Sequence, residues 1–96
     1  MTIDLAPLEV LRKEQDAIDR ELMAAIAKRY AVRQKISAFR RSNSLPTVDP
    51  DRMKYVLQQA EAYAAEMGVP VEMAHHIYSV LIGWSHDLDR QWRKEA

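Results

Sequence analysis

The chain has 96 residues, with 14 lysine and arginine residues against 14 aspartate and glutamate residues, so its formal net charge is zero. This balance provides no global basic excess that would favour nucleic acid or an anionic membrane as a partner. There is no cysteine, which excludes a disulfide framework and a thiolate site.

The N-terminal residues lack the basic start and apolar run of a signal peptide. No stretch approaches the roughly 20 apolar residues of a membrane span. We therefore expect a cytoplasmic protein with one small domain over residues 1–96, whose core would be marginal without oligomerisation.

The first predicted element is one long helix from Leu8 to Arg41, a span without glycine or proline. Its apolar residues recur at steps of three and four once Gln15 and Arg29 are counted as polar interruptions, which is the spacing of one helix face. They are Leu8, Leu11, Ile18, Leu22, Ala25, Val32, Ile36 and Phe39. Such a helix would be about 50 Å long, whereas a compact globule of this size is about 32 Å across. We therefore expect a second copy of the helix to cover the apolar face, in an intertwined homodimer.

Two shorter helices are predicted after a loop that follows Arg41. Asp49 and Pro50 are a typical helix start, a capping side chain followed by proline at the first helical position. Gly68 should end this helix as a left-handed cap, and a third helix should begin at Pro70 and fray after Arg93. Strand signals are nearly absent, so the predicted fold class is all-α with three helices per chain.

Several charged residues fall on or near the predicted apolar faces. Arg29 takes a position where a hydrophobe is expected, and burying an unpaired guanidinium costs several kcal/mol. At 100° per residue, three guanidinium groups and one apolar side chain share a stripe of the first helix. They belong to Arg29, Arg33, Ile36 and Arg40. Such a stripe predicts an anionic partner, either acidic side chains or an anionic ligand.

Further polar residues could complete an anion site. Arg52 lies in the first turn of the second helix, where backbone amides also attract anions. Ser85 and Asp89 are four residues apart near the apolar face of the third helix. A metal site is not expected, because the adjacent His75 and His76 diverge by about 100° on a helix.

A structural alternative needs no ligand. Gln15 or Arg29 could set the register of paired helices, and Arg33 and Arg40 could form a solvated face. The chain would then be a non-catalytic helical dimerisation module.

The ordered set of these residues resembles the all-helical chorismate mutases over residues 8–93. The matching segments are Arg12 in LRKEQDAID, Arg29 in AKRY, Arg40, DPDR from Asp49 to Arg52, and SHDLD from Ser85 to Asp89. The resemblance implies an intertwined dimer in which the long first helices pair. It also implies an isomerase that converts chorismate to prephenate by a Claisen rearrangement, without cofactor, metal or covalent intermediate.

The resemblance implies a role for each matching residue. Arg12 of one protomer would reach into the other's site, and with Arg29 and Arg52 it would hold the carboxylates of a small dicarboxylate substrate. The planar fork of arginine suits this task because it binds carboxylate bidentately and keeps its charge. Ser85 would lie at a carboxylate or ring edge, and the backbone around Asp49 would meet the ring hydroxyl.

Three positions differ from the usual pattern of the family. Arg40 stands where lysine is usual, Met53 where glutamate is usual, and Asp89 where glutamine is usual. The positions of Arg40 and Asp89 are the catalytic pair that donates to the ether oxygen. Asp89 can donate only when protonated, and pairing with Arg33 or Arg40 would keep it ionised.

These differences leave the substrate open. Met53 together with Asp89 resembles the variant pattern of 4-amino-4-deoxychorismate mutases. An apolar residue at Met53 also resembles isochorismate pyruvate lyases. Both activities are therefore alternatives to chorismate mutase itself.

Overall fold

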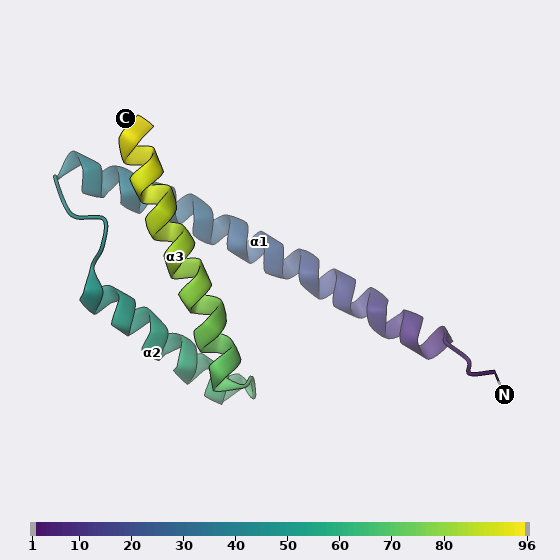
Figure 1. Cartoon of the computed structure of the whole chain (residues 1–96). Helices are drawn as coiled ribbons and strands as arrows, with labels where there is room; N and C mark the ends of the chain where they lie inside the picture. The colour runs from purple at the N-terminus through teal and green to yellow at the C-terminus, as the bar shows by residue number, and fades with distance from the viewer. Residues whose placement is uncertain (1, 96) are drawn as a thin grey trace. The chain divides into compact units, whose positions relative to one another are not determined.

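The computed structural model describes residues 2–95, which contain three α-helices and no strand. The helices are α1 (Ala6–Ser42), α2 (Pro50–Met67) and α3 (Val71–Glu95), as Figure 1 shows. The predicted all-α class with one long and two shorter helices is confirmed. α3 differs in detail, because it begins just after Pro70 and continues past Arg93, where fraying was expected.

Contacts within the chain group its residues into two compact units, Met1–Arg33 and Gln34–Ala96. The first unit is formed by the N-terminal part of α1. Its apolar face is open in the single chain, since Leu11, Ile18 and Leu22 are 59%, 60% and 57% exposed. The predicted single domain over residues 1–96 stays a prediction.

α2 begins and ends at the residues that the sequence predicts. The Asp49 side chain accepts a hydrogen bond of 3.1 Å from the backbone amide of Arg52, and Pro50 opens the helix. Gly68 closes it with φ 73° and ψ 25°. This left-handed conformation favours glycine because it brings the Cβ of other residues close to the backbone.

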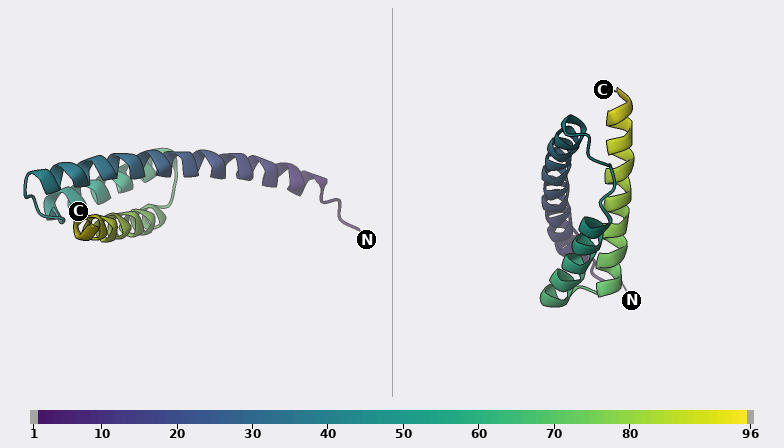
Figure 2. Two further views of the ribbon diagram at one scale, coloured as in Figure 1. Left: turned by 90° about the horizontal axis from the view of Figure 1, so that it is seen from above. Right: turned by 90° about the vertical axis from the view of Figure 1, so that its left-hand side faces the viewer.

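α2 and α3 pack against each other within the second unit and are joined by residues 68–70 (Figures 1 and 2). The buried apolar side chains are Ala60 and Ala64 on α2 and Ala74 and Ile82 on α3. Because three of the four are alanines, the two backbones can approach closely, but little apolar volume is buried.

None of the three helices described in residues 2–95 combines the length and the apolar character that crossing a membrane requires.

Replacing Gly68 by alanine should lower the free energy of unfolding by about 1 kcal/mol. A Cβ at this position meets no atom within 4 Å, so the cost comes from the positive φ alone. Gly83 is the matched control, because it lies inside α3 and a Cβ there is equally unobstructed. Gly83→Ala should stabilise the protein by about 0.5 to 1 kcal/mol. Urea denaturation measures both, and equal effects of the two substitutions would contradict the left-handed cap.

Candidate functional site

A buried polar cluster lies between the end of α1 and the C-terminal half of α3. Ser37 and Asp89 are both fully buried. The Ser37 hydroxyl donates to Asp89 Oδ1, and Arg93 Nε donates to Asp89 Oδ2 over 3.1 Å. The Thr47 hydroxyl also hydrogen-bonds to the Asp89 carboxylate. Asp89 therefore joins α1, the loop between α1 and α2, and α3.

The surroundings of Asp89 favour its ionised form. Burial by itself raises the pKa of Asp89, but the hydrogen bonds from Ser37 and Thr47, together with the charge and hydrogen bond of Arg93, outweigh it. The net result is a pKa below the ordinary value of 3.8. At neutral pH Asp89 is therefore a carboxylate that accepts hydrogen bonds.

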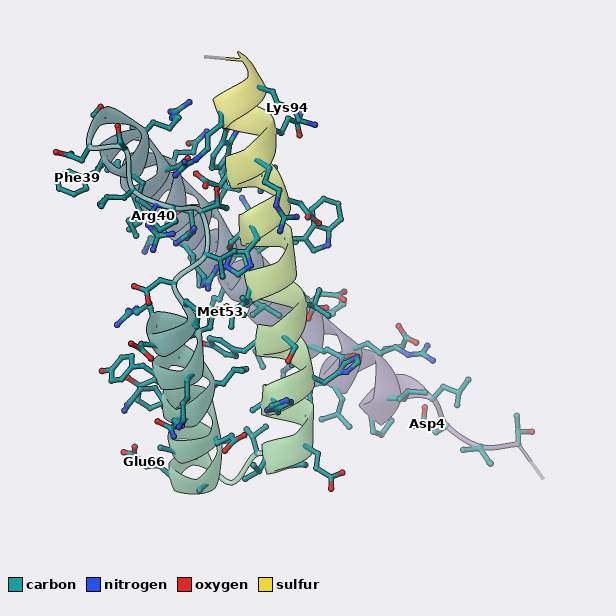
Figure 3. All side chains as sticks on the ribbon, turned by 60° about the vertical axis from the view of Figure 1, so that its left-hand side comes forward. Asp4, Phe39, Arg40, Met53, Glu66 and Lys94 are labelled. Atoms are coloured by element: carbon teal, nitrogen blue, oxygen red, sulfur yellow. The ribbon has the colours of Figure 1, made fainter. Side chains whose placement is uncertain are left out.

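Two guanidinium groups at the end of α1 bind backbone carbonyls. Arg40 Nη1 donates to the Thr47 carbonyl over 2.8 Å, and Arg41 Nη1 donates to the Trp92 carbonyl over 3.0 Å. Arg93 Nη2 donates to the Leu45 carbonyl over 2.6 Å. Figure 3 shows Arg40 beside the loop and Met53 at the start of α2. Arg40 on α1 and Arg93 on α3 thus hold the loop, and Arg41 joins α1 to α3.

The first turn of α2 carries three of the predicted site residues. Asp49 caps the helix through its side chain, so its carboxylate is used for folding. The Arg52 guanidinium lies 4.8 Å from the centre of the Tyr55 ring, within cation–π range. Met53 is partly buried and places a neutral side chain beside these charges.

Three predicted substrate-binding residues, Arg12, Arg29 and Arg33, lie on α1 in the first unit. Arg12 Nη1 is paired with Glu9 over 2.8 Å, and its side chain is 61% exposed. Ile36 lies on the part of α1 that belongs to the second unit and is 36% exposed.

Within the second unit, two predicted residues lie on the same face of α3. Ser85 and Asp89 are both buried on one face of α3, and the Ser85 hydroxyl donates to the Leu81 carbonyl over 2.8 Å. Within this unit the cation on Asp89 is Arg93, and the head group of Arg40, one of the two partners predicted for Asp89, binds the Thr47 carbonyl. The alternative pairing of Asp89 with Arg33 stays a prediction.

Sequence reasoning missed Ser37, Thr47 and Arg93. Arg93 follows Asp89 by four residues on the same helix, which is the spacing of an intrahelical ion pair and was a usable signal. No comparable sequence signal marked Ser37 or Thr47, because both pair with residues far away in the sequence. Over residues 2–95 no group of three histidine, aspartate or glutamate side chains could hold a metal ion.

The ionised state of Asp89 has a measurable consequence for stability. Because folding lowers its pKa, the stabilisation is fully present above pH 3.8 and is lost as the pH falls through the folded pKa. Asp89→Asn should lower the free energy of unfolding by about 1 to 3 kcal/mol at pH 7, since one charge and two of its hydrogen bonds are weakened. Chemical denaturation at pH 7 and at pH 3.5 should show this difference shrinking in acid. A difference that is constant across this range would contradict the assignment.

Comparison with known proteins identifies the family of this chain. The family chorismate mutase type II matches residues 11–90. A 4-amino-4-deoxychorismate mutase of Streptomyces pristinaespiralis is 29% identical over 86 residues, which cover 90% of this chain and 67% of that protein. A chorismate mutase of Methanocaldococcus jannaschii is 26% identical over 89 residues, covering 93% of this chain and 90% of that protein. A 4-amino-4-deoxychorismate mutase of Streptomyces venezuelae is 29% identical over 75 residues, covering 78% and 73%. The chain therefore belongs to the chorismate mutase type II family.

Proposed function

We propose that this protein is a chorismate mutase-type isomerase that rearranges chorismate to prephenate. The observation that carries the proposal is the family match over residues 11–90, which includes the arginines at positions 12, 29, 40 and 52. The reaction is unimolecular and needs no nucleophile or proton transfer. A site that orients the substrate and stabilises growing negative charge is therefore sufficient.

In this proposal, guanidinium groups hold the substrate's two carboxylates. Arg12, Arg29 and Arg52 have this role, because bidentate arginine–carboxylate pairs combine charge with orientation. Arg33 and Ile36 contact the same substrate. Ser85 and the backbone at Asp49 contact its polar edge, and Met53 contacts its ring.

Arg40 is the proposed donor to the ether oxygen. Its partly buried head group uses one N–H for the Thr47 carbonyl, and arginine has five such donors. Asp89 was predicted as the second member of the catalytic pair. The lowered pKa of Asp89 opposes a donor role at neutral pH, so Arg40 carries the donation.

A second candidate substrate is 4-amino-4-deoxychorismate. The combination of Met53 with Asp89 resembles the variant pattern of 4-amino-4-deoxychorismate mutases, and the neutral Met53 supports this candidate, whereas the Asp89 carboxylate is already engaged by Ser37, Thr47 and Arg93. Two of the relatives are named for that substrate.

Incubation of the purified protein with chorismate, 4-amino-4-deoxychorismate and isochorismate, followed by mass spectrometry, separates these activities. We expect prephenate from chorismate. Faster rearrangement of the amino compound would favour the second candidate, and release of pyruvate from isochorismate would indicate a lyase. No product from any of the three would overturn the proposal and favour a dimerisation module.

Arg29→Ala should reduce kcat/KM by about 10- to 150-fold, because a charged hydrogen bond of roughly 1.5 to 3 kcal/mol is lost. Arg90→Ala is the control, since Arg90 is exposed on α3 and pairs only locally with Asp87 at 3.1 Å. It should leave kcat/KM unchanged. If Arg29→Ala instead shifted only the dimer equilibrium, with ligand affinity intact, Arg29 would be a structural residue.

The proposal includes a homodimer with shared active sites. Two apolar faces support it. One lies on the first unit and contains Leu11, Ile18 and Leu22, and the other lies on α3 and contains Ile77 and Trp84, which is 64% exposed. Exposed apolar stripes at helical spacing favour pairing with another helix.

Leu22→Asp should weaken the dimer more than 100-fold, because an unpaired carboxylate would be buried at the interface. Ala24→Asp is the matched control, since it adds the same charge on the opposite side of α1. Sedimentation equilibrium measures both variants and the parent protein. A monomeric parent, or equal weakening by the two variants, would contradict pairing through this face.

A further inference from the structure

The loop of residues 43–49 is held mainly by polar contacts. Its apolar residues Leu45 and Val48 are only partly buried, at 42% and 37% exposed. Ser44 has a positive φ of 53°, which is unfavourable for a residue other than glycine. The loop conformation therefore depends on groups that bind it from outside.

Three side chains supply these contacts. Arg93 binds the Leu45 carbonyl at 2.6 Å and Arg40 binds the Thr47 carbonyl at 2.8 Å. Asp89 accepts a hydrogen bond from the Thr47 side chain. Charge-assisted bonds of this kind are roughly twice as strong as neutral ones.

Arg93 connects these contacts to one another. Its Nε binds Asp89 at 3.1 Å while its Nη2 binds Leu45. Asp89 in turn accepts from Ser37 on α1. A single guanidinium fork thus links the buried carboxylate to the loop, which the one head group of lysine cannot reproduce.

The loop leads directly into the first turn of α2. Asp49 is its last residue, and the capping bond from the Arg52 amide to Asp49 starts the helix. The positions of Leu45 and Thr47 therefore affect the position of the Arg52 backbone, from which its side chain extends.

We propose that Arg93 is a positioning residue, which acts through Asp89 and the Leu45 carbonyl to fix the loop that places Arg52. The catalytic consequence rests on the proposed mutase function, whereas the ordering of the loop does not. Asp89 is a positioning residue of the same network, with its carboxylate engaged by Ser37, Thr47 and Arg93.

Hydrogen exchange tests the structural part without substrate. The reporters are the Leu45 amide, which donates to the Arg40 carbonyl at 2.8 Å, and the Arg52 amide, which donates to Asp49 at 3.1 Å. Arg93→Gln should speed exchange at both about tenfold, while the amide of buried Ala64 in α2 is unchanged. Arg93→Lys should also show faster exchange at Leu45 than the parent protein. Lysine keeps a positive charge near Asp89, but it lacks the planar guanidinium that binds Asp89 and the Leu45 carbonyl together.

Arg90→Gln is the matched control, since Arg90 lies on the same helix and pairs with exposed Asp87. It should leave exchange at Leu45 and Arg52 unaltered. Unchanged exchange at these amides in Arg93→Gln, or equal acceleration at Ala64, would overturn the inference.

Steady-state kinetics tests the catalytic part. A misplaced Arg52 should raise KM about tenfold in Arg93→Gln and lower kcat less. Faster loop exchange with unchanged KM would overturn the link to the site. A parent protein that turns over none of the three substrates, together with faster loop exchange in the variant, would refute the proposed function while supporting the loop-fixing role of Arg93.

Discussion

The buried carboxylate of Asp89 imposes the constraint on which the second unit depends. An ionised group without solvent contact must receive its hydrogen bonds from the protein. Its donors come from α1, the loop and α3, in the form of Ser37, Thr47 and Arg93. Satisfying one carboxylate therefore orders three segments at once. A neutral glutamine at this position would not require a cation. The charge of Asp89 therefore explains why an arginine lies at position 93.

The Asp89 network has a structural role and is not proposed to bind substrate. It binds the loop that leads into α2, where the proposed substrate-binding residue Arg52 lies. Rearrangement catalysed by orientation is sensitive to small displacements, since a shift of about 1 Å can cost a factor of roughly 100. In the proposal, the position of Arg52 depends on a loop whose apolar residues Leu45 and Val48 are only partly buried. Polar contacts made by Arg40 and Arg93 with backbone carbonyls add to this apolar packing. Arg40 is thus both a proposed donor to substrate and part of the support.

The sequence was sufficient to predict the helices because their signals are local. Apolar spacing and the absence of glycine and proline predicted α1, and Asp49, Pro50 and Gly68 predicted the ends of α2. The pairing of Asp89 with Arg93 was not predicted, and of the two partners that were, Arg40 binds the Thr47 carbonyl while Arg33 stays a prediction. Helical periodicity shows that several arginines can face inward, but the choice between Arg40 and Arg93 depends on the course of the loop. That course rests on long-range contacts to Leu45 and Thr47, which spacing does not encode.

The small core explains why assembly and activity belong together in the proposed dimer. The buried apolar side chains of the second unit are mostly alanines, which contribute less apolar area than leucine or phenylalanine. Large apolar side chains are instead exposed, on the N-terminal part of α1 and on the face of α3 that contains Ile77 and Trp84. A second copy would bury surface that one chain leaves in water, and the same event would bring in Arg12 of the partner. In the proposed dimer, the interface would supply the apolar contribution to stability, and the interior of a chain of this size could then hold a charged network.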